Sequence, residues 1–371
     1  MSQTKAQLIS GTSSQDVTFD DATVSSLNGG ALSGARNRII NGDMRIDQRN
    51  AGASVTINSS NNFYPVDRLA CTGQATDGVF TVQRSTTAPS GFTNSVIATV
   101  TTADASIGAT QQYLIAQFVE GFNIADLGWG AAGAQSVTLS FWVRSSLTGT
   151  FGGSLVNSAF NRSYPFSYTI NAANTFEYKT VTITGDTTGT WLSDSGVGVR
   201  VFLSLGAGST YLGTAGAWSG SYLIGPTGQT NIIATNGATF YITGVQLEAG
   251  SVATPFERRS YGQELALCQR YYFNGLQGVG GSCYNTADAV FCVRNVTTMR
   301  AAPTLSFSSG STQSIDVTGA STFNVPNANF SFDRQTVNGF RMYTGSGSLG
   351  TRTLGQPVEL LANTLQASAE L

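Results

Sequence analysis

The sequence predicts an all-β protein built around a jelly-roll β-sandwich. The first observation is the stretch 136–146, SVTLSFWVRSS, in which Val137, Leu139, Phe141 and Val143 alternate with polar positions or Trp. This pattern is typical of a strand that buries one face against a second sheet. The second observation is a series of similar segments separated by turns rich in Gly, Asn and Pro. The third is that no helical period separates these segments, which disfavours a βαβ fold.

The predicted strands follow one another at short intervals. Besides 136–146, they are expected at 79–84, 95–101, 111–120, 150–157, 162–170, 176–183, 198–205 and 239–247. A further strand at 37–40, NRII, is expected to end in a tight turn at Asn41-Gly42, because this dipeptide readily adopts positive φ. About ten strands connected in this way are typical of a sandwich or jelly roll.

The chain is expected to contain four parts. These are an N-terminal arm at 1–36, the jelly-roll sandwich at 37–259, a connecting helix at 260–275 and a smaller C-terminal β domain at 276–371. The arm is of low complexity and cannot bury enough surface to fold alone, so it is either a docking peptide or a disordered tail. The helix is predicted because Leu265, Cys268 and Tyr272 recur at helical spacing.

The composition excludes several function classes. Charged residues make up 11% of the 371 residues and the formal net charge is −2, so no broad basic field is available for nucleic acid. No apolar run approaches the length of a membrane span, and the N-terminus lacks the apolar core of a signal peptide. We therefore expect no nucleic-acid partner, no membrane insertion and no export by the usual route.

Histidine is absent, which excludes catalytic Ser-His-Asp and Cys-His arrangements and leaves no zinc set. The cysteines are widely spaced without a CxxC motif, at Cys71, Cys268, Cys283 and Cys292. Buried free thiols, formed in a reducing cytosol, are favoured over a disulfide. We expect neither a cofactor nor a metal ion.

Aromatic side chains in glycine-rich connections are the predicted ligand-binding residues. A sugar presents apolar C–H faces and a rim of hydroxyls, so its site needs an exposed flat ring beside polar groups. Trp129 lies in ADLGWGAAG, and the long connection 206–237 contains Tyr211, Trp218 and Tyr222. The alternative for each ring is a loop anchor packed on the rim of the sandwich or buried between subunits.

Other aromatic residues are expected to have a packing role. Trp142 and Trp191 lie in or beside predicted strands, and Tyr164, Tyr168 and Tyr178 alternate along them.

No catalytic residues are predicted. Hydrolysis of a glycosidic bond needs two carboxylates converging on it, and the available Asp126, Glu177, Asp186 and Asp194 occur in contexts typical of backbone caps. Glu248 is expected to hold a neighbouring turn by accepting backbone N–H bonds. The charges at 257–259, ERR, are expected to be solvated or interfacial.

Five segments resemble virion proteins of tailed bacteriophages, of the tail-fibre type. They are NRIINGDMRIDQRNAG at 37–52, YPVDR at 64–68, LSFWVRSSLTGTF at 139–151, FEYKTVTITGDTTGTW at 176–191 and FYITGVQLEAGSVATPFERRSYGQELALCQRYY at 240–272. In addition, 299–305 and 365–371 resemble the distal module of such fibres.

This resemblance implies a carbohydrate-binding jelly roll in a receptor-binding fibre on the exterior of the virion. It also implies a homotrimer that contacts other virion proteins through residues 1–36 and binds a host cell-surface polysaccharide. Two alternatives stay open at this point. One is a capsid decoration or a head or collar fibre that binds other virion proteins, and the other is a polysaccharide depolymerase.

Overall fold

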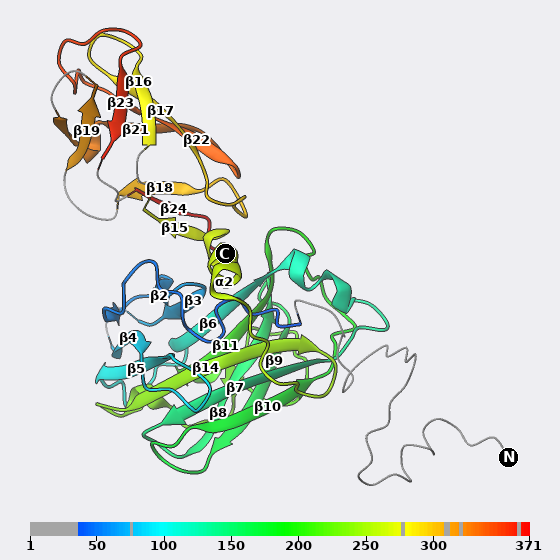
Figure 1. Ribbon diagram of the computed structural model, residues 1–371. Coiled ribbons are helices and arrows are strands. Elements are labelled where there is room, and N and C mark those ends of the chain that lie inside the picture. The colour runs from blue at the N-terminus through cyan, green and yellow to red at the C-terminus, as the bar shows by residue number, and fades with distance from the viewer. Residues whose placement is uncertain (1–35, 75–76, 276–278, 308–311, 319–321, 362–364) are drawn as a thin grey trace, which may run out of the picture.

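The computed structural model describes residues 36–371 except 75–76, 276–278, 308–311, 319–321 and 362–364. The predicted arm at 1–36 therefore lies outside the described residues, apart from Arg36. The described chain forms a large β-sandwich and a smaller β domain, with one α-helix between them (Figure 1). The predicted all-β class, with a jelly-roll sandwich and a smaller C-terminal β domain joined by a short helix, is confirmed.

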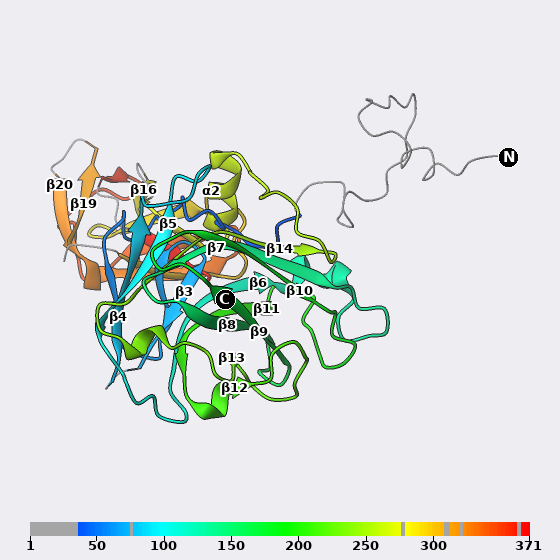
Figure 2. The ribbon, with the colours of Figure 1, turned by 90° about the horizontal axis from the view of Figure 1, so that it is seen from below.

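The sandwich consists of two six-stranded antiparallel sheets. In spatial order, the first sheet contains β1 (Val55–Ile57), β4 (Val79–Ser85), β5 (Ser95–Thr102), β14 (Thr239–Ala249), β7 (Val137–Ser145) and β10 (Glu177–Ile183). The second sheet contains β2 (Phe63–Val66), β3 (Leu69–Thr72), β6 (Gln112–Glu120), β11 (Val197–Ala207), β8 (Gly149–Asn157) and β9 (Ser163–Ile170). Figure 2 shows β7 and β14 above β11, β8 and β9.

The core lies between these two sheets, and β7 shows how the sequence places it there. Val137, Leu139, Phe141 and Val143 are fully buried and belong to the core between the sheets. The polar residues and Trp142 that alternate with them point to the outer face of the first sheet. The nine strands predicted from this alternation between 79 and 247 are all present, with ends that differ by at most two residues.

The predicted strand at 37–40 is absent, although the turn that follows it is confirmed. Asn41 has a φ of 58° and its carbonyl accepts the N–H of Met44. Arg38 N donates to the carbonyl of Leu247 in β14, but the Asn37 side chain oxygen accepts the N–H of Leu247 at 3.1 Å. The Asn37 side chain therefore accepts a hydrogen bond that a backbone carbonyl would accept in a regular β-ladder.

Gly42 lies in tight contact with β14. A Cβ atom at this position would lie 2.2 Å from the carbonyl oxygen of Val245, whose N–H donates to the carbonyl of Gly42. We expect Gly42→Ala to lower the free energy of unfolding by about 2 kcal/mol or more, because backbone has to move. Chemical denaturation measures this effect. The control is Gly220→Ala, where no atom lies within 4 Å of the added Cβ, and a loss as large there would contradict the explanation.

Short elements connect the strands at the two ends of the sandwich. They are η1 (Gly121–Asn123), η2 (Ala125–Leu127), η3 (Ser209–Tyr211), β12 (Leu212–Gly213), β13 (Gly225–Pro226) and η4 (Ile232–Ala234). The long connection at 206–237 contains four of these elements. Residues from this connection pack on the outer face of the second sheet, where Ile224 joins a buried cluster with Leu114 and Phe202.

The helix α2 (Tyr261–Gln269) begins after Ser260, whose hydroxyl accepts the N–H of Gln263 at 3.3 Å. The distal domain that follows contains a three-stranded sheet of β15 (Tyr272–Asn274), β24 (Leu365–Ser368) and β18 (Thr304–Phe307). Its second, seven-stranded sheet contains β20 (Thr322–Pro326), β19 (Thr312–Val317), β23 (Pro357–Leu360), β16 (Val279–Cys283), β17 (Ala289–Arg294), β22 (Gly339–Thr344) and β21 (Phe330–Thr336), and η5 (Asn327–Asn329) precedes β21.

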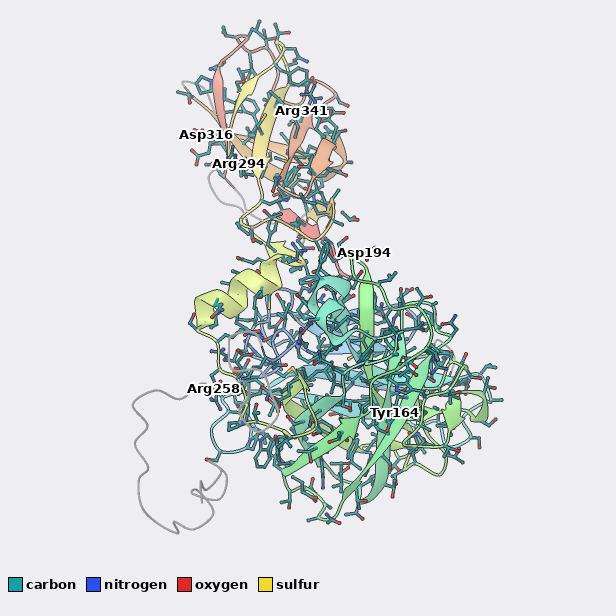
Figure 3. The ribbon with its side chains drawn as sticks, turned by 90° about the vertical axis from the view of Figure 1, so that its right-hand side faces the viewer. Tyr164, Asp194, Arg258, Arg294, Asp316 and Arg341 are labelled. Atoms are coloured by element: carbon teal, nitrogen blue, oxygen red, sulfur yellow. The ribbon has the colours of Figure 1, made fainter. Side chains whose placement is uncertain are left out.

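Buried charges join the distal domain to the sandwich. Glu120, at the end of β6, accepts hydrogen bonds from the guanidinium of Arg270 and, at 2.6 Å, from the hydroxyl of Tyr271. Arg68 pairs with Glu370, and its guanidinium lies 3.5 Å from the ring centre of Tyr271. We call these five residues the junction. Figure 3 shows Asp194 near the point where the two domains meet, and the neighbouring Ser195 carbonyl accepts a bond from Arg300 at 2.8 Å.

All four cysteines are free thiols, but their environments differ. Cys71, Cys268 and Cys283 are buried as predicted, whereas Cys292 is exposed. The prediction of burial is wrong for Cys292 because it alternates with Phe291 and Val293, which occupy the inner face of β17. Within the described residues, no helix is both long enough and apolar enough to cross a membrane.

Candidate functional site

An aromatic pair lies on the outer face of the first sheet. In the antiparallel register, Trp142 of β7 is opposite Tyr178 of β10 on one side and Thr243 of β14 on the other. Directly opposite residues share a face of the sheet, so the two rings lie side by side. Their centres are 5.4 Å apart with an interplanar angle of 45°. Trp142 is half-buried and Tyr178 is 43% exposed.

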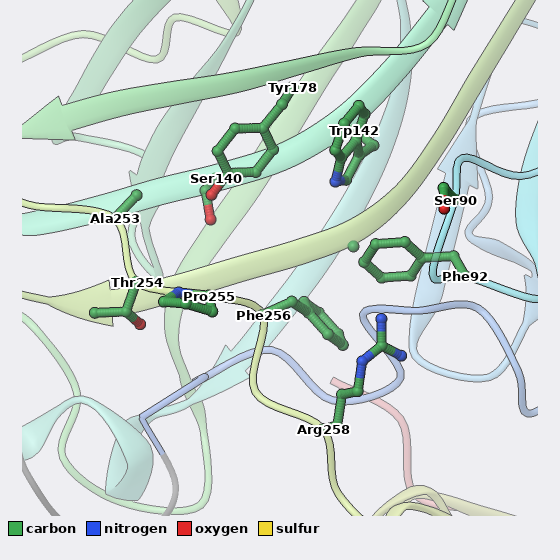
Figure 4. Close-up of a pocket in the computed structure, with 11 residues that line it drawn as sticks. Ser90, Phe92, Ser140, Trp142, Tyr178, Ala253, Thr254, Pro255, Phe256 and Arg258 are labelled. Atoms are coloured by element: carbon green, nitrogen blue, oxygen red, sulfur yellow. The ribbon is translucent and has the colours of Figure 1, made fainter.

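Two connections contribute side chains that lie beside this pair. The β4–β5 connection contributes Phe92, and the segment after β14 contributes Phe256 and Arg258. The rings of Phe92 and Phe256 meet edge to face with centres 5.2 Å apart, and the Arg258 guanidinium lies 4.8 Å from the centre of the Phe92 ring. Figure 4 shows these side chains around one cleft with Trp142 and Tyr178. The five residues define what we call the aromatic cleft.

The aromatic cleft has a volume of ≈ 500 Å³ and is open to solvent. Ser90, Ser140 and Thr254 also line it, but Ser140 and Thr254 are buried and the Thr254 hydroxyl donates to Glu248. Flat rings for C–H faces, next to the exposed Ser90 side chain and a guanidinium for sugar hydroxyls, are the groups that a carbohydrate needs. The arrangement can bind and orient a glycan. None of its described lining residues is a carboxylate.

Gly244 allows the two parts of the cleft to approach each other. It has a φ of 62° in an irregular part of β14, where the pairing with β7 shifts between Thr243 and Gln246. A Cβ atom at Gly244 would lie 2.7 Å from Phe92 and 3.1 Å from Trp142. The Thr243 hydroxyl donates to the carbonyl of Asn94 at 2.7 Å, which fixes the connection that carries Phe92.

A buried hydrogen-bond network holds the segment 251–258 over the sheet. Glu248 accepts the N–H of Thr254 at 2.8 Å and its hydroxyl at 2.6 Å, and it also accepts a bond from Gln246. The backbone N–H of Glu257 donates to the Gln246 side chain at 2.8 Å. The predicted role of Glu248 is therefore confirmed. The network positions Phe256 and Arg258 at the cleft.

The charges at 257–259 divide between two roles, which corrects the expectation of a solvated or interfacial cluster. Arg258 is exposed, but the side chain of Arg259 is mostly buried. Arg259 donates to the carbonyls of Asn37 and Ile39 and pairs with Glu264 of α2. A cation near the start of α2 is tolerated because Glu264 compensates its charge.

The structure brings Trp129 and Trp218 together, but not as exposed platforms. Their ring centres are 5.6 Å apart, and each also packs on Trp191, at 4.6 Å from Trp129 and 5.4 Å from Trp218. Trp129 is 8% exposed and Trp218 is half-buried against the core. The expected exposure is therefore wrong for Trp129. Each indole N–H donates to a backbone carbonyl, of Gln135 and Thr184, so the rings anchor loops here.

The predicted Tyr211 and Tyr222 form a separate pair, with ring centres 5.1 Å apart. They lie on the outer face of the second sheet, away from the aromatic cleft. Both are half-buried, and Tyr222 lines a groove there together with Phe160 and Arg200. No ligand contact of these four predicted residues is tested, so their binding role stays a prediction.

Trp142 and Tyr178, which line the aromatic cleft, were not among the predicted ligand-binding residues. Both were expected to be packed in strands, as Tyr164 and Tyr168 are, at 6% and 7% exposure. The sequence did contain a signal for Trp142. It alternates with the core residues of β7 and therefore lies on the opposite, polar face of the strand. No comparable signal identifies Phe92 or Phe256, since each lies in an irregular connection.

The four carboxylates considered for catalysis all have structural partners. Asp186 binds Arg162, and Asp126 binds Arg38. Asp194 accepts the N–H of Gly196 at 2.8 Å. Within the described residues, no group of three or more Cys, Asp or Glu side chains is placed to hold a metal ion.

The fourth carboxylate, Glu177, fixes the turn before β10. Burial alone raises its pKa, but hydrogen bonds from Lys179 and from the N–H groups of Ala172 and Asn171 outweigh this and lower the pKa from 4.5 to about 2. Because the folded-state pKa is the lower one, the stabilisation is complete above pH 4.5 and is lost as the pH falls toward 2. We expect Glu177→Gln to reduce the acid destabilisation in this window, as measured by unfolding at several pH values. An unchanged pH profile would contradict this.

No family model and no curated protein matches the sequence. Among solved structures, the chain is similar to the enzymatically active domain of bacteriophage CBA120 tailspike protein 4, with 13% identity, a TM-score of 0.29 and coverage of 58% of this chain and 21% of that chain. It is also similar to a family 11 carbohydrate-binding module from Clostridium thermocellum in complex with a β-1,3-1,4-mixed-linked tetrasaccharide. The identity is 10%, the TM-score is 0.26, and the match covers 55% of this chain and 99% of that chain.

A third similar structure is TmCBM61 in complex with β-1,4-galactotriose, with 10% identity, a TM-score of 0.27 and coverage of 58% of this chain and 99% of that chain. The chain spans about a fifth of the tailspike domain. At TM-scores this low, none of these similarities establishes a relationship.

Proposed function

We propose that the protein binds a cell-surface carbohydrate in the aromatic cleft and does so as a non-enzymatic part of a bacteriophage virion. The observation that carries the binding function is the pair Trp142 and Tyr178, which presents solvent-accessible rings beside the exposed side chains of Ser90 and Arg258. Trp142 lies outside the core, on the outer face of the first sheet, and its ring is half-buried beside Tyr178. The phage origin is supported by the resemblance of 37–52 and 240–272 to tail-fibre proteins.

In this proposal the protein is a homotrimer on the exterior of the virion, attached to other virion proteins through residues 1–36. Several copies would multiply a weak affinity of each cleft, since binding of a second copy is effectively intramolecular. Light scattering on the purified protein measures its oligomeric state. A trimer is expected, and a stable monomer would refute this part of the proposal.

The binding function is tested by applying the full chain to an array of bacterial surface polysaccharides and following reducing ends during incubation with any glycan that binds. We expect saturable binding and no release of reducing ends. Release of new reducing ends would instead identify a depolymerase. Antibody labelling of intact particles tests the position: label on the tail is expected, whereas label confined to the capsid would favour a decoration protein.

A further inference from the structure

A second groove lies on the opposite side of the sandwich, on the outer face of the second sheet. Phe160, Arg200 and Tyr222 line it, together with the amide side chains of Asn62 and Gln112. Its volume is ≈ 210 Å³, less than half that of the aromatic cleft. We call these five residues the Arg200 groove. None of them belongs to the aromatic cleft.

Phe160 is held in an unfavourable backbone conformation. It lies in the turn between β8 and β9 with a φ of 57°, a region that a bulky side chain rarely adopts. The side chain oxygen of Asn157 accepts the N–H groups of Asn161 and Arg162, both at 3.1 Å, and keeps the turn in this shape. The ring is nevertheless 42% exposed. A strained backbone that holds a partly exposed ring points to a function for the ring.

Arg200 is a partly buried cation in the groove. Its guanidinium lies 4.0 Å from the centre of the Phe160 ring, and Nη1 donates to the carbonyl of Asn157 at 2.6 Å. Within the described residues no ion pair joins Arg200 to a carboxylate. Burial lowers the pKa of Arg200 to about 10, partly opposed by Tyr222, so the group stays charged at neutral pH. A partly buried cation of this kind is stabilised when an anion binds to it.

Polar groups and a second ring complete the groove. The Tyr222 ring meets Phe160 edge to face at 4.9 Å, and its hydroxyl donates to the Gln112 side chain at 2.8 Å. The Gln112 amide and the Asn62 side chain provide neutral hydrogen-bonding groups for hydroxyls. The groove thus combines a fixed guanidinium, an exposed flat ring and amides within a space suited to a single sugar unit.

We infer that the Arg200 groove binds an acidic sugar, with the carboxylate on Arg200 and the apolar face of the ring on Phe160. The carboxylate matches the planar guanidinium, which has free N–H donors, and the edge of the sugar faces the amides. This binding function is separate from that of the aromatic cleft, which has its own lining residues on the other sheet. The protein would then recognise two chemically different parts of a glycan, or two glycans.

The test uses calorimetry with the full chain and three probes: trigalacturonate, a trisaccharide that ends in N-acetylneuraminate, and neutral galactotriose. We expect at least one acidic probe to bind at least about tenfold more tightly than galactotriose, with weaker binding at higher salt. Arg200→Gln should reduce this affinity by at least about tenfold. Phe160→Gly should reduce it by about tenfold without lowering the melting temperature, because glycine accommodates the positive φ.

Phe122→Ala is the matched control, because it removes an even more exposed ring, at 60%, which lies in η1 and is not among the described lining residues of the groove. It should leave the affinity for the acidic probe unchanged. Trp142→Ala distinguishes the two sites, since loss of acidic binding in this variant would place the ligand in the aromatic cleft and overturn the inference. The inference is also overturned if neither acidic probe binds, if galactotriose binds as tightly as the acidic probes, or if Phe160→Gly keeps full affinity for the acidic probe.

Discussion

Replacing Trp142 by alanine lowers the affinity of the protein for its glycan by roughly thirtyfold, or about 2 kcal/mol. The indole provides the largest flat surface of the aromatic cleft, and its loss leaves Tyr178 without its cross-strand neighbour. The melting temperature changes little, because the ring is half-exposed and lies outside the core. Calorimetry with the glycan selected on the array measures the affinity of both proteins.

Trp191→Phe provides the matched control for this result. Trp191 belongs to the ring cluster with Trp129 and Trp218 and lies outside the aromatic cleft. We expect this variant to lose stability through poorer packing while keeping its affinity for the glycan. The opposite pattern, with affinity lost in Trp191→Phe and retained in Trp142→Ala, would move the binding site to the ring cluster.

Replacing Glu370 by alanine destabilises the protein by about 3–5 kcal/mol, since it leaves the guanidinium of Arg68 buried without its counter-charge. Arg68 is 3% exposed and pairs with Glu370, which also accepts a bond from Arg49 at 3.0 Å. The Arg68 guanidinium also contacts the ring of Tyr271 in the junction. Because the ion pair joins the C-terminal segment to the sandwich, its loss should also separate the unfolding of the two domains. Differential scanning calorimetry measures both effects.

The double variant Arg68→Met, Glu370→Met tests the cause of this loss. Removing both charges leaves no unpaired ion at Arg68, and Arg49 still lies 3.9 Å from Asp67, so most of the stability should return. If the double variant is as unstable as Glu370→Ala, the defect comes from lost packing rather than from the buried, unpaired charge of Arg68. A loss below about 1 kcal/mol in Glu370→Ala would show that the pair is effectively solvated.

The strands could be predicted because their chemistry is local. A strand such as β7 alternates apolar and other residues with a period of two, and burial of one face is enough to define its position and its inner side. The prediction fails at 37–40 for an equally local reason. The side chain of Asn37 makes the hydrogen bonds that a strand would need, and sequence alternation carries no information about this competition.

The candidate site depends on contacts that are distant in sequence. Phe92 and Phe256 come from different connections, and they meet only because β5 and β14 are neighbours in the first sheet. Glycine-rich surroundings suggested an exposed Trp129, but the ring is covered by Trp191 and Trp218 from two other segments. The junction shows the same limit, since Arg68 and Glu370 are separated by 302 positions.

The central claim is that Trp142 is the tryptophan that contacts glycan. The chain contains four tryptophans, so uniform labelling with 5-fluorotryptophan gives four fluorine resonances, and Trp142→Phe identifies the one from Trp142. On titration with the glycan selected on the array, we predict that the Trp142 resonance shifts and that the other three, from the ring cluster, stay in place. Shifts confined to the ring cluster, with the Trp142 resonance unchanged, would contradict the proposed site.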